Sequence, residues 1–487
     1  MAIIADYYAL LNLPQDATSE EIRNAYFKAA RRYHPDATPD PFMREHFIQI
    51  QQAYDVLSNN RQRSKYDMAL LESFIIPEIA IDVKCSRTVI PKLSEEQLFY
   101  SLIDIRCVSD YDATKRAPFF LCLVIDTSTS MDGKRLEMVK SNLINVLGEL
   151  NDDDIVCIIS FNDRAEVILE PVQKAEVKNL EHYVHLLYAK GGTELYQGLL
   201  KGYRILEEKG KGYLSKHIIL MTDGHTYGDE DAAIALSREA EENGIVITAF
   251  GFGDEWNDSF LDKVTSNTGG NATYVRYADD LKHYLSQKVQ VYGKLYANKV
   301  EYNFFMDGCV DLRYVFRMYP DITPMTCSDG LLFGNLQYNG NLKVFLEYAI
   351  KPVENGKKNV RISSGRLKMN IANTDKEAQM FLKINVPISE KRFSEPPPTP
   401  IVEAMSKLML YRMQEKARDE ISNGKISEGT KHLQHLATHL LSQGNRELAR
   451  AVLVEAEHIN KNKSFSEEGD KRIKYATRSL LLPSGLE

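Results

Sequence analysis

The segment Leu123–Gly133 reads LVIDTSTSMDG, and its apolar run stops at Asp126. Side chains that carry oxygen then occupy alternate positions, at Ser128 and Ser130. Short runs that are wholly apolar and alternate with amphipathic helices are typical of parallel strands covered by helices on both sides. Similar runs follow at 155–159, 218–221 and 245–252. The sequence therefore predicts a doubly wound α/β domain over residues 117–290.

Two later segments carry polar side chains of the same kind. Gly191-Gly192-Thr193 opens an amphipathic helix, and Thr222-Asp223-Gly224 ends a buried strand. Loops at the carboxyl ends of the strands converge in an open α/β sheet, so we expect these side chains to meet. The candidate ligands are Asp126, Ser128, Ser130, Thr193 and Asp223. Hydroxyls and carboxylates without His or Cys favour a hard cation, Mg²⁺ first, with Mn²⁺ or Ca²⁺ as alternatives.

Two other interpretations of this segment are weaker. A hydrolase nucleophile at Ser128 or Ser130 would need a G-x-S-x-G elbow and a base, and the sequence D-T-S-T-S offers neither by spacing. A calcium loop of the EF-hand kind would need Gly at its sixth position, where Met131 stands, and a helix before it. We therefore favour a cation site assembled from distant loops.

Residues 118 to about 290 resemble a von Willebrand factor A domain, whose metal-ion-dependent adhesion site combines D-x-S-x-S, a distal Thr and an Asp in a T-D-G turn. The resemblance implies that Asp223 acts through water or an indirect contact. It implies these inner ligands: Asp126, Ser128, Ser130 and Thr193. A magnesium ion so held keeps a position for an outside ligand, so we expect a protein ligand that donates a carboxylate.

The N-terminal residues 1–68 have a helical pattern. Thr18-x-x-Glu21 is a capping box, and apolar residues recur behind it at helical spacing. The helix is expected to end at His34, because Pro35 disfavours the α conformation in the residue before it. A second, antiparallel helix should follow, with Phe47 in its apolar stripe. The opposite side of the first helix carries four basic residues: Arg23, Lys28, Arg31 and Arg32.

This hairpin resembles the J domain of DnaJ-type co-chaperones. The resemblance rests on Asp6–Leu11, on His34-Pro35-Asp36, on Gln52-Ala53-Tyr54 and on Arg63-x-x-Tyr66-Asp67. It implies that His34, Pro35 and Asp36 trigger ATP hydrolysis in a DnaK-type chaperone, and that the four basic residues dock its acidic surface. A basic strip on a small hairpin also favours association with acidic partners on electrostatic grounds alone.

Alternating strands flank the α/β segment at 76–112 and 295–390, which predicts a β-sandwich with the α/β domain inserted into it. Asn339-Gly340 and Asn355-Gly356 are hairpin turn signals within the second part. A Pro-rich linker at 391–400 precedes a helical domain at 401–487. The predicted architecture is thus multidomain, with an all-α hairpin, an α/β domain, a sandwich and C-terminal helices.

The 487 residues carry a net charge of −8, so nothing suggests nucleic acid as a main partner. No apolar run approaches the roughly 18 residues that span a bilayer, and we expect no membrane partner. The six cysteines lack any C-x-x-C pair, as in reduced proteins, so the predicted location is the cytoplasm.

Together these features predict a non-enzymatic adaptor, in which the A-like domain binds a protein ligand through its cation and the J-like hairpin recruits a DnaK-type ATPase. One alternative is a regulator or assembly factor of an AAA+ ATPase of the MoxR or chelatase kind, because A domains accompany such machines. A serine hydrolase acting through Ser128 or Ser130 is a weaker alternative.

Overall fold

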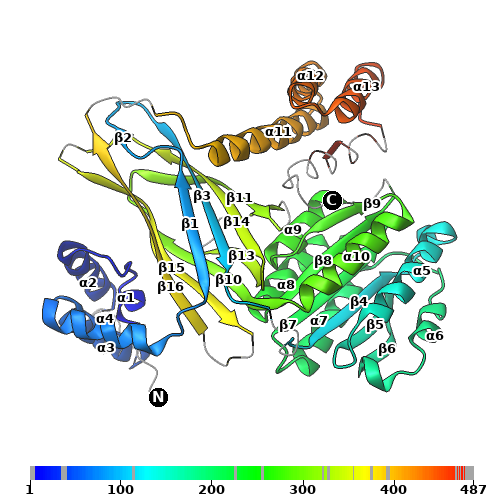
Figure 1. Cartoon of the computed structure of the whole chain (residues 1–487), viewed down its shortest axis with the longest axis horizontal. Coiled ribbons are helices and arrows are strands. Elements are labelled where there is room, and N and C mark those ends of the chain that lie inside the picture. Colours follow the sequence, from blue (N-terminus) through cyan, green and yellow to red (C-terminus); the bar gives the residue numbers. More distant parts are fainter. Residues whose placement is uncertain are drawn as a thin grey trace.

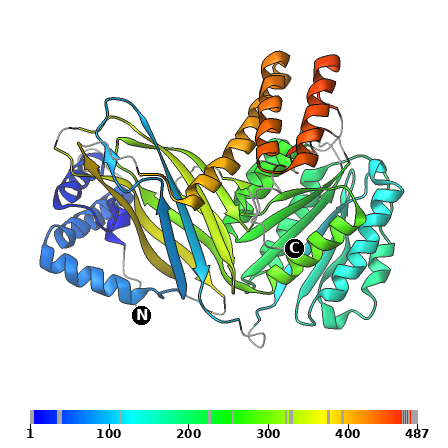
Figure 2. The same ribbon diagram turned by 45° about the horizontal axis from the view of Figure 1, so that its top comes forward.

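The chain has four parts (Figures 1 and 2): a helical domain at the N-terminus, a two-sheet domain in the middle, an α/β domain at the opposite end, and C-terminal helices above the last two. This computed structural model describes residues 6–33, 41–111, 116–223, 228–253, 257–320, 323–325, 330–354, 356–372, 374, 377–390 and 395–466, together with residues 469, 471, 473, 474 and 477.

The α/β domain contains a six-stranded sheet in the order β6-β5-β4-β7-β8-β9. Its strands are β4 (Phe119–Asp126), β5 (Ile155–Phe161), β6 (Ala165–Gln173), β7 (Ser215–Thr222), β8 (Ile245–Phe252) and β9 (Ala272–Val275). The predicted parallel pairing is found for all neighbours except β6, which runs antiparallel to β5. The residues between β5 and β6 are too few for a parallel crossover, so β6 returns directly as an edge strand.

Helices cover both faces of this sheet. One face packs against α5 (Lys134–Glu149), α6 (Leu180–His185) and α10 (Ala278–Tyr292). The other face packs against α7 (Leu195–Lys209), α8 (Glu230–Glu242) and α9 (Asp258–Asn267). Every residue of β4 is buried, because this central strand has a helix layer on either side. The wholly apolar run before Asp126 is explained by this position.

The two-sheet domain takes strands from both sides of the α/β domain. One sheet has the order β1-β3-β14-β11-β12 and the other β13-β10-β15-β16-β2. The strands are β1 (Ile79–Cys85), β2 (Ile90–Pro91), β3 (Gln97–Cys107), β10 (Leu295–Phe305), β11 (Val310–Tyr319), β12 (Thr323–Pro324), β13 (Leu331–Gln337), β14 (Asn341–Ile350), β15 (Asn359–Ile371) and β16 (Glu377–Ser389). Buried side chains of both sheets form one hydrophobic core.

The expectation of hairpins at the two Asn-Gly signals is wrong. Asn339 has a positive φ of 54°, as such a turn requires, but it joins β13 of one sheet to β14 of the other. The signal at Asn355 falls between β14 and β15, which also belong to different sheets, and Asn355 itself lies outside the described residues. A tight turn reverses the chain, but burial decides which sheet the next strand joins. In β14 nearly every residue is buried, because α11 covers its outer face.

The N-terminal helical domain contains α1 (Tyr7–Leu10), α2 (Ser19–Tyr33), α3 (Pro41–Leu57) and α4 (Asn60–Ser73). The helical region therefore runs five residues beyond the predicted boundary at 68. The capping box forms, with Thr18 N donating to Glu21 Oε2 at 2.7 Å and Glu21 N donating to Thr18 Oγ1 at 3.2 Å. Ile22 of α2 and Ile50 of α3 are fully buried between the two helices.

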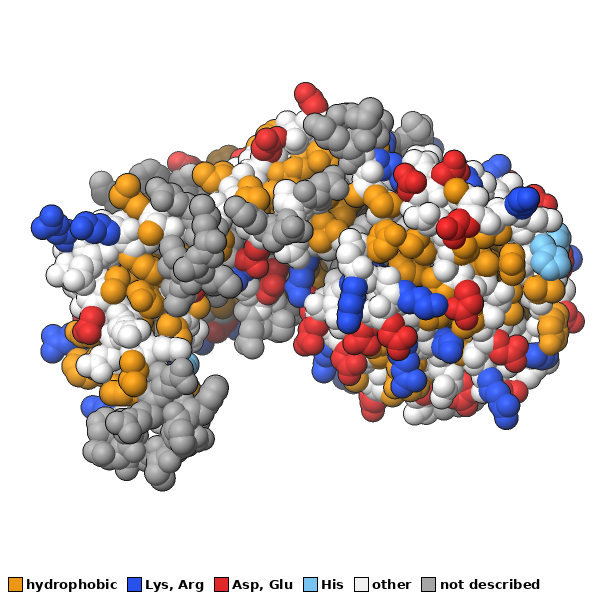
Figure 3. Space-filling view, turned by 90° about the horizontal axis from the view of Figure 1, so that it is seen from below, with side chains coloured by type: hydrophobic (Ala, Val, Ile, Leu, Met, Phe, Trp, Pro, Cys, Tyr) orange, Lys and Arg blue, Asp and Glu red, His pale blue; other side chains and the backbone are white. Residues whose placement is uncertain are grey.

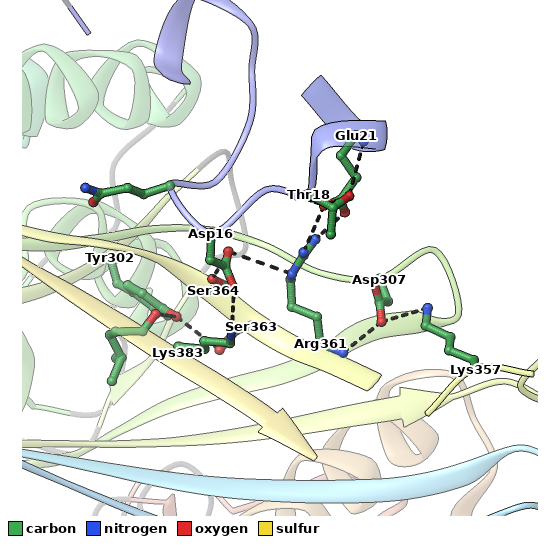
Figure 4. A network of polar contacts seen from close by, with 12 residues as sticks. Asp16, Thr18, Glu21, Tyr302, Asp307, Lys357, Arg361, Ser363, Ser364 and Lys383 are labelled. Atoms are coloured by element: carbon green, nitrogen blue, oxygen red, sulfur yellow. Dashed lines mark hydrogen bonds and ion pairs between the residues drawn. The ribbon is translucent and has the colours of Figure 1, made fainter. Parts of the chain in front are cut away.

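Polar contacts hold this domain against the outer surface of β15 and β16 (Figure 4). Arg361 donates to both carboxylate oxygens of Glu21, at 2.8 and 3.2 Å. Asp16 accepts from Ser364 Oγ at 2.7 Å and pairs with Lys383 Nζ at 2.8 Å. Asp6, which also caps α1, pairs with Arg366. We call these six charged residues the hairpin interface: Asp6, Asp16, Glu21, Arg361, Arg366 and Lys383.

The C-terminal helices are α11 (Thr399–Ser422), α12 (Ile426–Ser442) and α13 (Arg446–Asn462). Arg412 of α11 donates to both oxygens of Glu347 in β14, at 2.8 and 2.9 Å. Further along the same helix, Arg418 pairs with Asp258 of α9 at 3.2 Å. The helix α11 thus contacts both the two-sheet domain and the α/β domain.

A buried arginine also links these two domains. Arg317 of β11 donates to the backbone oxygens of Gly269 and Gly270, at 2.7 and 3.0 Å, in the loop before β9. Seen from below, the helical domain and the α/β domain form two lobes with a hollow between them (Figure 3). The described cysteines are all free thiols, and no described helix is long and apolar enough to cross a membrane.

Candidate functional site

The site begins where β4 ends. Asp126 is fully buried, and its Oδ1 accepts a hydrogen bond from the backbone N of Ser128 at 2.8 Å. Its Oδ2 accepts from Thr222 Oγ1, at the end of the neighbouring strand β7, at 2.6 Å. The hydroxyl of Ser128 lies 3.0 Å from that of Ser130. Two adjacent parallel strands therefore place a carboxylate and hydroxyls at one edge of the sheet.

Asp223, the residue directly after β7, completes this group. Ser130 Oγ donates to Asp223 Oδ1 at 2.7 Å, so the contacts run without a break from Asp126 through Ser128 and Ser130 to Asp223. The second oxygen of Asp223 accepts from Arg135, in the first turn of α5. Four of the five predicted ligands are thus brought together by the fold. We call Asp126, Ser128, Ser130 and Asp223 the oxygen cluster.

Thr193, the fifth predicted ligand, lies in a loop beside the cluster. Thr129 donates from its backbone N and its hydroxyl to the oxygen of Gly191, both at 3.1 Å. The N of Lys190 donates to Thr127 O at 2.7 Å. Thr193 is half-buried, and in the described part of the chain no hydrogen bond joins its side chain to the cluster. Its role as a ligand stays a prediction.

The two carboxylates differ in their electrostatic surroundings. Burial raises the pKa of Asp126 to about 6, although hydrogen bonds from Thr222 and Ser128 oppose this rise. No cation is paired with Asp126 among the described residues, whereas Asp223 has Arg135. A buried carboxylate without a neighbouring positive charge is costly, and a bound cation would remove that cost.

The donor set fits a divalent cation of the hard kind. It consists of carboxylate and hydroxyl oxygens, which suit Mg²⁺ and also Mn²⁺ or Ca²⁺. Among the described residues no group of three or more His, Cys, Asp and Glu side chains is arranged to hold a metal, so the candidate depends on the serine hydroxyls. Neither Ser128 nor Ser130 is hydrogen-bonded to a histidine in the described residues.

A second candidate site lies on α2. Arg23, Lys28, Arg31 and Arg32 are exposed along this helix, although its N-terminal end is held at the hairpin interface. The docked domain therefore leaves its basic strip accessible. His34, Pro35 and Asp36, predicted to act in the same site, lie outside the described residues.

Sequence reasoning missed two residues of the first site, Thr222 and Arg135. Thr222 was part of the quoted T-D-G turn, but its hydroxyl was not expected to bind Asp126. Arg135 stands nine residues after Asp126, and a basic residue in the first turn of a helix that follows the D-x-S-x-S segment was the available signal. Its contact with Asp223 depends on the distance between β4 and β7, which the sequence alone does not give.

Comparison with known proteins agrees with three of these parts. The DnaJ domain family matches residues 6–67, and the von Willebrand factor type A domain family matches residues 121–287. The family described as Sll0103-like, C-terminal alpha-helical domain, matches residues 399–483. The chain therefore carries a J domain, a von Willebrand factor A domain and an Sll0103-like helical domain.

Similar individual proteins cover only parts of the chain. An uncharacterized protein, sll0103, from Synechocystis sp. is 34% identical over 180 residues, which are 37% of this chain and 43% of that relative. The chaperone protein DnaJ 1 from Aquifex aeolicus is 49% identical over 67 residues, which are 14% of this chain and 18% of that relative. The chain thus spans less than half the length of these relatives.

Two solved structures share the fold more widely. A von Willebrand factor type A protein from Catenulispora acidiphila has a TM-score of 0.66 at 15% identity, covering 83% of this chain and 97% of that chain. The ArnB paralog VWA2 from Sulfolobus acidocaldarius has a TM-score of 0.54 at 14% identity, covering 82% and 98%. The likeness extends well beyond residues 121–287, so it includes strands of the two-sheet domain.

Proposed function

We propose that this protein is a non-enzymatic adaptor, which binds a divalent cation at the oxygen cluster, captures a carboxylate of a protein ligand through that cation, and recruits a DnaK-type ATPase through its J domain. In this proposal the α/β domain is an insertion in a β-sandwich that connects the two functions. The observation that carries the proposal is the oxygen cluster itself, because it joins two buried carboxylates that, among the described residues, are paired with a single cation, Arg135.

The residues have distinct tasks in this proposal. Asp126, Ser128 and Ser130 would hold the ion, with Thr193 and Asp223 completing the site. The ion supplies an electrophilic position for an anionic ligand when it is bound. Thr222 orients the Asp126 carboxylate through its 2.6 Å hydrogen bond, and the backbone N of Ser128 fixes the other oxygen. Neither oxygen can turn away without losing a contact.

The J domain supports the second half of the proposal. Its four basic side chains are accessible while the domain is docked, so an acidic ATPase surface could approach without undocking. Opposite charges of this kind mainly raise the association rate. The match to DnaJ proteins is limited to this domain.

The proposal is tested with two measurements on the full chain. Calorimetric titration with Mg²⁺ or Mn²⁺ alone should detect one site, and Asp126→Ala should remove it. Stimulation of a DnaK-type ATPase should be lost in His34→Gln and kept in Asp126→Ala. Absence of metal uptake by the wild-type chain would refute the first half, and equal stimulation by wild type and His34→Gln would refute the second.

A further inference from the structure

Arg135 lies at the end of the oxygen cluster and touches it at two points. Its Nη1 donates to the Asp223 carboxylate and also to the backbone oxygen of Ser130, the latter at 3.1 Å. The residue is in the first turn of α5, directly after the turn at Gly133 that ends the D-x-S-x-S loop. A cation of the chain is therefore in contact with two of the residues that form the candidate metal site.

The neighbouring residue Gly253 also limits where the Arg135 guanidinium can lie. Gly253, just after β8, has a φ of +71°, and a Cβ added there would lie 2.5 Å from Nη2 of Arg135. Any larger residue at 253 would displace the guanidinium. The side chain is 42% exposed, although Asp223 and the backbone oxygen of Ser130 bind its guanidinium and Gly253 leaves room for it. Arg135 thus has a defined place at the cluster, unlike an ordinary surface arginine.

The charges of the cluster follow directly. Asp126 and Asp223 contribute two negative charges when ionised, and Arg135 contributes one positive charge at Asp223. A divalent ion added to this set leaves a net charge of about +1, whereas without Arg135 the same set would be neutral. The guanidinium therefore repels the ion and competes with it for the oxygens of Asp223. Both effects weaken metal binding.

We propose that Arg135 is an internal cation that limits the affinity of the oxygen cluster for a divalent ion. This inference rests on the proposed function, because it presumes that the cluster is a metal site. It assigns to Arg135 a part that the resemblance to A domains did not: the residue sets how much free metal the site needs. Arg135 is a positioning residue for Asp223 and not itself a ligand.

The test is a titration of the full chain with Mn²⁺ alone, in which binding is measured by calorimetry and by the electron paramagnetic resonance signal of free Mn²⁺. We expect Arg135→Gln to bind Mn²⁺ about tenfold more tightly than wild type, which corresponds to about 1.4 kcal/mol. Arg135→Lys keeps the charge and should bind nearly as weakly as wild type. Lys134→Gln removes the same charge from the neighbouring exposed residue and should stay within about twofold of wild type.

A second readout separates competition from a general loss of structure. In EDTA, Arg135→Gln should unfold at a lower temperature than wild type, because Asp223 has lost its partner, and Mn²⁺ should raise its unfolding temperature more than it raises that of wild type. A merely structural arginine would give the first effect without the second.

The outcomes are distinct. Equal or weaker Mn²⁺ binding by Arg135→Gln, with uptake by wild type, would overturn the role of Arg135 and leave the metal site standing. An equal increase in Mn²⁺ affinity in Lys134→Gln and Arg135→Gln would also overturn the role of Arg135, because loss of any nearby positive charge would then explain the increase. No uptake by any variant would overturn the metal site and this inference together. Uptake by Arg135→Gln that exceeds wild-type uptake supports both.

Discussion

The hairpin interface and the oxygen cluster are two groups of carboxylates with opposite charge balance. At the hairpin interface three acids meet three bases, each carboxylate with its own cation. Figure 4 shows the pairs of Glu21 with Arg361 and of Asp16 with Lys383. At the oxygen cluster, of the two buried acids only Asp223 is paired with a cation among the described residues, namely Arg135. The first group is neutral within the chain and needs nothing else. The second lacks positive charge at Asp126, and this deficit distinguishes a candidate binding site from a structural contact.

The pKa shifts of the carboxylates reflect the same difference in charge balance between the hairpin interface and the oxygen cluster. Burial tends to raise the pKa of Glu21, but hydrogen bonds from Arg361 and Thr18 outweigh it, and the pKa falls to about 2. The pKa of Asp16 is likewise lowered, because hydrogen bonds from Lys383 and Ser364 outweigh burial. The pKa of Asp126 rises to about 6, because burial there meets no compensating cation. Carboxylates in the two groups should therefore respond to mutation and to pH in opposite ways.

The largest expected effect is on metal binding. Asp126→Asn should weaken the uptake of Mn²⁺ about 100-fold or more, because a neutral amide replaces the charged ligand. Asp16→Asn is the matched control and should bind Mn²⁺ as wild type does, since Asp16 is already neutralised by Lys383. Calorimetric titration of both variants measures the contrast. Equal weakening in both would show that the two groups are not functionally different.

The next effect concerns the docking of the J domain. Arg361→Glu would place a negative charge between Glu21 and Asp16 and should cost about 3 kcal/mol of docking free energy. The segment between α4 and β1 should then be cleaved faster by a protease under native conditions. Arg313→Glu reverses a charge on β11, in the other sheet, where Arg313 pairs with Glu96, and should leave the cleavage rate unchanged. Identical rates for the two variants would contradict a role of the ion pairs in docking.

The pH dependence of stability should have opposite signs in the two groups. The pKa of Glu21 is lower in the folded protein, so its stabilising contribution is present above about pH 4.5 and is lost as the pH falls toward 2. The pKa of Asp126 is raised, so without metal its ionisation destabilises the fold as the pH rises from about 4 through 6. Relative to wild type in EDTA at pH 7, Glu21→Gln should be destabilised and Asp126→Asn stabilised, by about 1 to 2 kcal/mol for the latter.

Denaturant unfolding at pH 4 and pH 7 measures both differences, and both should shrink at the lower pH. Adding Mn²⁺ at pH 7 should remove the advantage of Asp126→Asn, because the metal compensates the charge only in wild type. A stabilisation of Glu21→Gln at pH 7 would reverse the comparison.

The smallest effect is expected at the basic strip. Arg31→Gln with Arg32→Gln should lower the association rate with a DnaK-type ATPase by about three- to tenfold at low salt, and by less at high salt. Lys368→Gln, an equivalent loss of charge on the two-sheet domain, should have no such effect. Surface plasmon resonance at two ionic strengths measures both. A rate loss that does not depend on salt would argue against electrostatic steering.

Local patterns predicted much of the fold. The capping box at Thr18 gave the start of α2, because it acts on the adjacent backbone. The helix end predicted at His34 lies outside the described residues. The buried runs gave β4, β5, β7 and β8, since a strand covered on both faces must be apolar throughout. The same approach placed four of the five proposed ligands at one edge of the sheet, because strand order determines which loops converge.

The sequence alone did not predict the contacts between distant segments of the chain. Glu21 was identified as a capping residue, but its pairing with Arg361 depends on how two domains pack. The Asn-Gly signals gave turns but not the strand partners, because the turn does not select the sheet. Arg135 was overlooked because only the folded sheet brings α5 beside Asp223. In each case the missing information was the packing of elements and not their identity.

The buried contact of Arg317 has one more consequence. Its guanidinium binds two adjacent carbonyls of the loop before β9, while its own strand belongs to the two-sheet domain that also carries the J domain. The hairpin interface and this contact together join α2 to the oxygen cluster through packed domains. The distance between these two sites is therefore set by the folded structure and not by a flexible linker. A protein bound to the J domain and a ligand bound at the oxygen cluster would therefore be held at a fixed distance and orientation relative to each other.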